Sequence, residues 1–142
     1  MTSYKTCRTA VFAFGVSLAL LACASHHYTA STVTAASDYA TVIERAQKKH
    51  RYIIMQSGIN LYTVTSVDMD KARQQMTVTL DKLDSTKFLN TAGLGSTGYN
   101  PAKGKTVALP QLHIHLSDST SYTYDEPHTI PMVKVGRLEV VD

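Results

Sequence analysis

The sequence predicts a mainly β fold, a small antiparallel barrel or sandwich preceded by one short helix. Two segments, 75–83 and 112–116, alternate apolar and polar residues as half-buried strands do. Other short apolar segments recur at roughly eight-to-twelve-residue spacing, separated by Gly, Asp and Ser. The length of 142 residues suits one domain, because two separate cores would each have about 70 residues, which is marginal.

The first 22 residues have the composition of a secretory signal peptide. Lys5 and Arg8 precede an apolar run over residues 10–21, which ends in small residues. A positive start, an apolar stretch and a small-residue exit are the features of such a signal. As a helix the run would span about 18 Å, well short of a hydrocarbon core of about 30 Å. It is therefore too short for a stable transmembrane anchor.

The end of this run, Leu20-Leu21-Ala22-Cys23, resembles the lipobox of bacterial lipoproteins. The resemblance implies cleavage before Cys23, acylation of Cys23 and attachment to the membrane through an N-terminal lipid anchor. Ala24, rather than Asp, follows the cysteine. In that family this favours the outer membrane, with the domain facing the periplasm. Plain secretion with cleavage after Ala24 is the alternative, because Ala22-Cys23-Ala24 also fits a small-x-small site.

We divide the chain into a signal peptide (1–22), an acylated cysteine with a flexible tether (23–37) and a single β-rich domain with a leading helix (38–142). The tether is rich in Ser, Thr and Ala and has no apolar period. Without residues 1–22 the chain has 12 basic and 11 acidic residues. This near-neutral balance argues against nucleic acid as a partner. No cysteine follows Cys23, which excludes a disulfide or a catalytic thiol in the domain.

The helix is predicted over residues 38–50, with Asp38 as its cap. Tyr39, Val42, Ile43 and Ala46 form an apolar stripe at helical spacing. The two lysines at 48–49 suit the negative end of the helix dipole. Because one stripe of this length is not stable alone, we expect it to pack on something larger.

After residue 50 the period changes from 3.6 to 2, and strands with intervening turns are predicted to the end of the chain. A helical turn over 84–90 is expected to carry Phe88 and Leu89 inward, and a Gly-rich loop follows over 91–105. The predicted strand segments are 51–56, 60–67, 75–83, 112–116, 128–132 and 137–141.

The last segment resembles the closing strands of small SH3-like β-barrels found in some bacterial lipoproteins. The match consists of Ile130, Val135, Leu138 and Val140. In those barrels a strand, a single 3₁₀ turn and a final strand follow one another. The resemblance implies an SH3-like form of the predicted barrel.

His113 and His115 are the most promising pair of metal ligands. At i and i+2 on a strand they point to one face, opposite Leu112, Ile114 and Leu116. Two such imidazoles can chelate Zn²⁺ or Cu²⁺ if a third ligand converges, and His128 or Asp118 are the candidates. The simpler interpretation is that this face is exposed to solvent and therefore polar.

Nucleotide binding and catalysis are not predicted. Gly93-Leu-Gly-Ser-Thr-Gly98 matches G-x-G-x-x-G, but Pro101 prevents the helix that a dinucleotide site requires. A near P-loop over residues 98–106 has the wrong spacing and no helix after it. No serine lies in a nucleophile elbow, and no paired carboxylates indicate a hydrolase. We expect neither enzymatic activity nor a cofactor.

The function predicted from these features is that of a lipid-anchored adaptor or structural module. It would bind an envelope protein that the anchor keeps nearby, so that modest affinity suffices. The alternative function is a module for a small ligand or metal, built on the strand face that carries His113 and His115.

Overall fold

The computed structural model describes residues 29–89 and 110–142. The predicted signal peptide, Cys23, the first part of the tether and the Gly-rich loop lie outside these residues. The elements are β1 (Ala30–Val33), α2 (Ala36–Lys48), β2 (Tyr52–Ser57), β3 (Asn60–Asp70), β4 (Gln75–Lys82), β5 (Gln111–Leu116), β6 (Pro127–Pro131), the 3₁₀ turn η1 (Met132–Lys134) and β7 (Val135–Val141).

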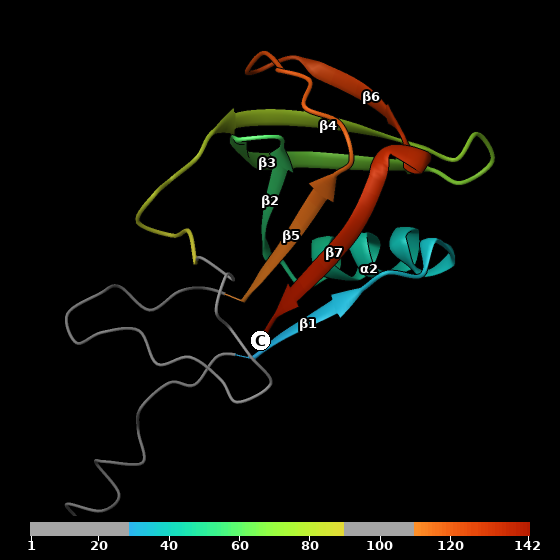
Figure 1. Ribbon diagram of the computed structural model, residues 1–142, viewed down its shortest axis with the longest axis horizontal. Helices are drawn as coiled ribbons and strands as arrows, with labels where there is room; N and C mark the ends of the chain where they lie inside the picture. The colour runs from blue at the N-terminus through green and yellow to red at the C-terminus, as the bar shows by residue number, and fades with distance from the viewer. Residues whose placement is uncertain (1–28, 90–109) are drawn as a thin grey trace, which may run out of the picture.

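The seven strands form one open, mixed sheet in the order β1-β7-β5-β2-β3-β4-β6. Figure 1 shows β3, β4 and β6 running across the direction of β5 and β7, so the sheet is strongly bent. The mainly β prediction is confirmed. The prediction of a small antiparallel barrel, SH3-like or otherwise, or of a sandwich is wrong, because β1 and β6 remain separate edges and β5 pairs with β2 in parallel.

The end of the chain follows the order that the barrel resemblance implied. β6, η1 and β7 succeed one another without a gap. However, β7 pairs with β5 on one side and with β1 on the other, and β1 is an edge of the open sheet.

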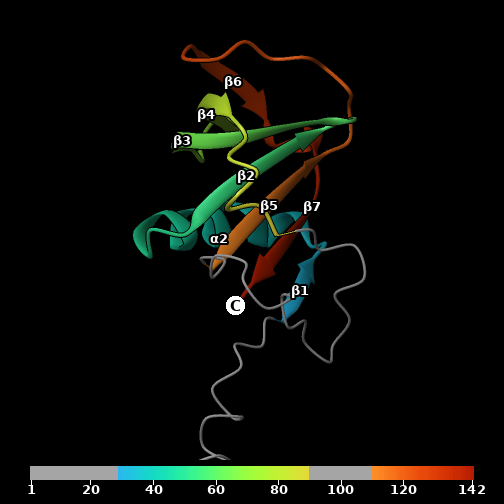
Figure 2. The same ribbon diagram turned by 90° about the vertical axis from the view of Figure 1, so that its left-hand side faces the viewer.

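Helix α2 lies against the bent sheet and completes the core (Figure 2). Tyr39, Ile43 and Ala46 of the predicted stripe are buried, and Val42 is partly buried against the same cluster. The Tyr39 hydroxyl also donates to the Gly136 carbonyl oxygen of β7 at 2.8 Å. Among the described residues, no helix combines the length and the apolar character needed to cross a bilayer.

Residues 30–33, which the sequence placed in the flexible tether, form the edge strand β1. Ala30 pairs with Val141, and Thr29 exchanges backbone hydrogen bonds with Asp142. Arg51 holds the same end of β7, since its guanidinium donates to the Val141 carbonyl oxygen at 2.9 Å and pairs with Asp142. The domain therefore begins several residues earlier than predicted.

Gly58, in the turn between β2 and β3, is expected to be intolerant of a side chain. Its φ is +61°, and an added Cβ would lie 2.8 Å from Ser119 Cβ. We expect Gly58→Ala to lower the free energy of unfolding by about 1–3 kcal/mol, measured by urea denaturation. Gly136→Ala is the matched control, because its nearest contact would be an ordinary 3.5 Å from the His115 carbonyl oxygen. Equal unfolding midpoints for both variants would contradict this account.

Candidate metal centre

The candidate metal centre lies on the sheet face opposite α2. Leu112, Ile114 and Leu116 of β5 point into the core beneath the helix. His113 and His115 point to the other face, as the period of a strand requires. This face is not open to solvent, because His113 is only 4% exposed. The expectation of an exposed polar face is therefore wrong for His113.

Residues 84–89 cover this face. Backbone bonds from Lys87 and Phe88 to the Asp84 carbonyl oxygen form the predicted helical turn. The Phe88 ring stacks on His113, with centroids 5.7 Å apart and planes at 22°. Leu89 is buried against Val141 and Ala30. The turn thus carries both apolar side chains inward, as predicted, and shields His113 from water.

The third polar group of the centre comes from β7. Glu139 pairs directly across from His113 in the antiparallel ladder, and Arg137 pairs across from His115. One potential ligand atom from each of His113, His115 and Glu139 lies within 4.8 Å of the other two. His115 Nε2 is 3.3 Å from Glu139 Oε1, which Arg137 Nε also approaches to 3.2 Å.

The other predicted candidates for a third ligand lie elsewhere. His128 is on β6, and β2, β3 and β4 separate that strand from β5. Its Nε2 is 2.9 Å from the Thr123 carbonyl oxygen, and its ring packs edge-on against Tyr122. Asp118 pairs with Lys134 at 3.1 Å. The structure therefore brings together the two predicted histidines with a glutamate that the sequence did not indicate.

Burial sets the protonation state of both histidines. Loss of water lowers the pKa of His113 to about 4, although the Glu139 carboxylate opposes this shift. Burial also lowers the pKa of His115, while Glu139 raises it and Arg137 lowers it further. Both rings are thus neutral at pH 7, the form in which imidazole binds a metal.

The ligand set suits a borderline divalent ion. Two imidazoles and one carboxylate are a known set for catalytic Zn²⁺, which keeps a fourth position for water or another ligand. With bonds of about 2.1 Å, neighbouring ligand atoms around tetrahedral zinc are about 3.4 Å apart. The His115–Glu139 distance of 3.3 Å already matches this value. The other ligand atoms are at most 4.8 Å apart, so these distances would have to shorten by up to about 1.4 Å.

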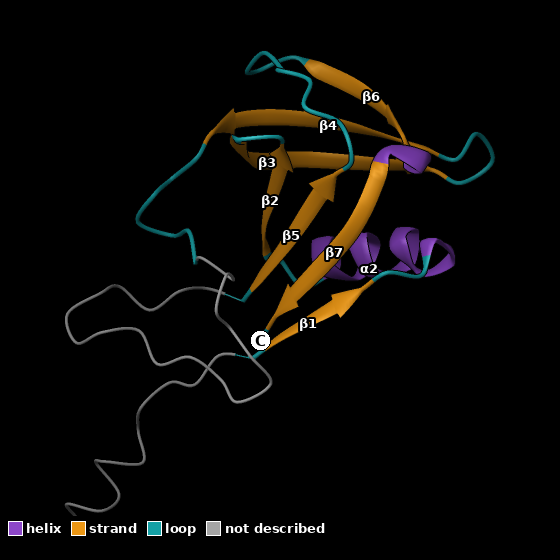
Figure 3. Cartoon of the chain, viewed as in Figure 1, coloured by secondary structure: helices purple, strands orange, loops and turns teal. Residues whose placement is uncertain are grey.

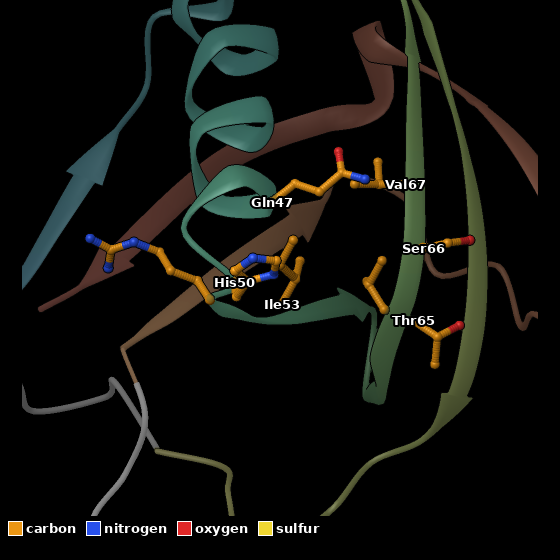
Figure 4. Close-up of a pocket in the computed structure, with 8 residues that line it drawn as sticks. Gln47, His50, Ile53, Thr65, Ser66 and Val67 are labelled. Carbon is orange, nitrogen blue, oxygen red and sulfur yellow. The ribbon is translucent and has the colours of Figure 1, made fainter.

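Two cavities lie away from this centre. One, of about 270 Å³, lies between the end of α2 and β3 (Figure 4). Its polar groups do not converge: the Arg51 guanidinium binds the C-terminal strand, and the Thr65 hydroxyl donates to the Thr79 carbonyl oxygen. In Figure 4 the hydroxyls of Thr65 and Ser66 point away from the helix. This geometry gives no basis for a specific ligand.

The second cavity is an open groove of about 520 Å³ between the first turns of α2, the β3–β4 turn and η1. Figure 3 shows η1 lying just above the helix. Met69, Met132 and Val133 are the large apolar residues of the groove, and small residues of α2 form its opposite wall. Val133 is 87% exposed. We call this feature the α2–η1 groove.

Comparisons with known proteins give no functional assignment, because no protein-family model, no curated protein and no solved structure matches the chain.

The buried histidines predict how stability depends on pH in the absence of metal. The folded pKa of His113 lies below the unfolded value, so the unfolded chain binds more protons between about pH 6.5 and pH 4. The free energy of unfolding is therefore highest, as far as His113 is concerned, above pH 6.5, and it falls as the pH drops toward 4. For His113 alone we expect a loss on the order of 2–3 kcal/mol by pH 4.5, and His115 adds to it.

This loss is measured by urea denaturation in the presence of a chelator, at pH 7 and at pH 4.5. His113→Gln should remove much of the pH dependence, whatever it does to the stability at pH 7. His128→Gln, on the distant strand β6, is the control and should leave the dependence unchanged. The same pH dependence in wild type and His113→Gln would show that His113 is not the group responsible.

Proposed function

We propose that the chain is a lipid-anchored protein of the bacterial envelope whose domain binds a divalent transition metal. The observation that carries metal binding is the convergence of His113, His115 and Glu139, with ligand atoms within 4.8 Å of one another. The resemblance of Leu20-Leu21-Ala22-Cys23 to a lipobox supports the anchor. Of the two functions that the sequence predicts, the geometry favours the metal module over the adaptor.

Burial supports metal binding over a purely structural role for these groups. Placing two imidazoles and a carboxylate together away from water is costly unless each group is well satisfied. His115 Nε2 is buried, and its 3.3 Å contact with Glu139 Oε1 lacks good hydrogen-bond geometry. A bound cation would interact favourably with both groups. The side chains of His115 and Glu139 remain 15% and 12% exposed, which provides a route for entry.

The preferred ions follow from the ligands. Imidazole and carboxylate favour Zn²⁺, Cu²⁺ and Ni²⁺ over Ca²⁺ and Mg²⁺, which prefer six or more oxygen ligands. The domain offers no thiolate ligand, because no cysteine follows Cys23 in the sequence. Zn²⁺ is therefore the appropriate first probe, and Cu²⁺ is the competitor that the general affinity order predicts to bind more tightly.

Zinc binding is tested by calorimetry on the full chain in detergent, with Cys7 and Cys23 replaced by serine so that no thiol contributes. We expect one Zn²⁺ per chain at pH 7. His115→Ala and Glu139→Gln should each weaken binding by at least about 100-fold, since even outer-shell losses cost 10–100-fold. His128→Ala should have no effect, because β6 is remote from the site. Absence of stoichiometric binding in the unmutated site would rule out this function.

The adaptor is the second candidate function, and the α2–η1 groove favours it. An exposed Val133 beside two methionines is the kind of apolar surface that protein partners cover. The proposed anchor at Cys23 would hold the groove near envelope partners and raise their effective concentration. A partner that docks there would leave the metal centre accessible, because that centre lies on the opposite face of the sheet.

The adaptor is tested in cells with a photo-reactive phenylalanine at position 133. We expect a discrete cross-linked product from this position, and its loss when Cys23→Ala removes the anchor. The matched control is the same residue at position 59, which is 96% exposed in the β2–β3 turn. Equal products from both positions, or no product from position 133, would exclude the groove as a docking surface.

A further inference from the structure

Gln111 is a fully buried polar residue at the start of β5. Its side chain lies on the same face as His113 and His115. Three polar groups surround its carboxamide. Oε1 accepts from the Leu89 backbone N–H at 3.2 Å, and Nε2 donates to the Lys87 carbonyl oxygen. His113 Nε2 lies 2.8 Å from the same Oε1.

The backbone partners fix the orientation of this carboxamide. The Leu89 N–H can only donate, and the Lys87 carbonyl can only accept, so the oxygen and nitrogen of Gln111 cannot be exchanged. The atom that faces His113 is therefore an acceptor. His113 Nε2 must carry a hydrogen to complete the 2.8 Å bond. A neutral imidazole has only one N–H, so Nδ1 keeps the lone pair.

We propose that Gln111 is the positioning residue of the metal centre. It holds His113 in the Nε2–H tautomer, so that Nδ1 is the nitrogen that binds the metal. It also links metal binding to the docking of residues 84–89. This inference rests on the proposed metal-binding function and adds to it the identity of the ligating nitrogen and a conformational consequence. Metal-bound histidines commonly donate their second N–H to an oxygen acceptor, which fixes the ring and raises its basicity. The Gln111 carbonyl oxygen is such an acceptor.

The link to residues 84–89 follows from the same hydrogen bonds. Gln111 Oε1 is shared between His113 and the Leu89 N–H, and Phe88 stacks on the His113 ring. A metal on Nδ1 holds the ring in place and polarises its Nε2–H toward this oxygen. Leu89 then contacts a Gln111 oxygen, and Phe88 a His113 ring, that are both held in place. By thermodynamic reciprocity, metal binding stabilises the docked segment as much as docking favours the metal.

The inference is tested with Gln111→Leu, which removes both the acceptor and the donor of the carboxamide. Wild-type protein should show His113 protonated only at Nε2 by ¹⁵N NMR, and Zn²⁺ should bind at Nδ1. In the variant, both neutral tautomers should be populated and Zn²⁺ affinity should fall by about 10–100-fold. In wild type, Zn²⁺ should also slow hydrogen exchange of the Leu89 amide, and the variant should lose this effect.

A second variant separates positioning from general destabilisation. Ile43→Ala removes a fully buried side chain from α2, on the opposite face of the sheet. It should lower the urea midpoint of unfolding, because it leaves a cavity in the core, while leaving Zn²⁺ affinity and the His113 tautomer unchanged. A comparable loss of affinity in Ile43→Ala would overturn the positioning role.

The remaining outcomes distinguish this inference from the function on which it rests. If wild-type protein binds Zn²⁺ but Gln111→Leu binds it equally well, or if the metal is on His113 Nε2, the inference is wrong and the metal-binding function stands. The inference is also wrong if Zn²⁺ binds at Nδ1 without slowing Leu89 exchange. If wild-type protein binds no Zn²⁺, both fail together.

Discussion

The position of β5 between β2 and β7 is the constraint on which the rest of the structure depends. Paired along both edges, this strand also has both faces covered: Leu112 and Ile114 lie in the core under α2, and His113 lies under Phe88. A polar residue in such a strand must find its partners within the protein. Gln111 does so by binding the backbone of the covering segment, and that segment in turn closes over His113.

Much of the secondary structure could be predicted from local patterns, and most of the pairing could not. The stripe of Tyr39, Ile43 and Ala46 predicts the helix to within two residues at each end, because helical spacing is local information. Alternation likewise predicts β4 and β5. The parallel pairing of β5 with β2 joins segments that lie far apart in the sequence, which no local pattern records. β1 is missed because its sequence, Ala-Ser-Thr-Val, lacks apolar alternation.

The residues of the candidate centre likewise fall into those that local sequence predicts and those that only strand pairing brings in. The period of a strand places His113 and His115 on one face without any tertiary knowledge. Glu139 joins them only through the register of β7 against β5, where it lies directly across from His113. The alternation in Arg137-Leu-Glu139 predicts a strand, but it does not indicate which strand pairs with it. The burial of the histidine face also depends on a distant segment, which is why an exposed face was expected and a covered one is found.

Burial has opposite consequences for stability and for binding at this centre. Without metal, keeping His113 neutral costs the fold more as the pH falls, because the unfolded chain can take up a proton that the buried ring resists. With metal, the same resistance means that no proton has to be displaced from the ring at neutral pH. Arg137, which lies 3.2 Å from Glu139 Oε1, opposes a nearby cation by charge repulsion. In the proposed centre, burial therefore keeps the imidazole ligands neutral, and the positive charge of Arg137 lowers the affinity for a cation.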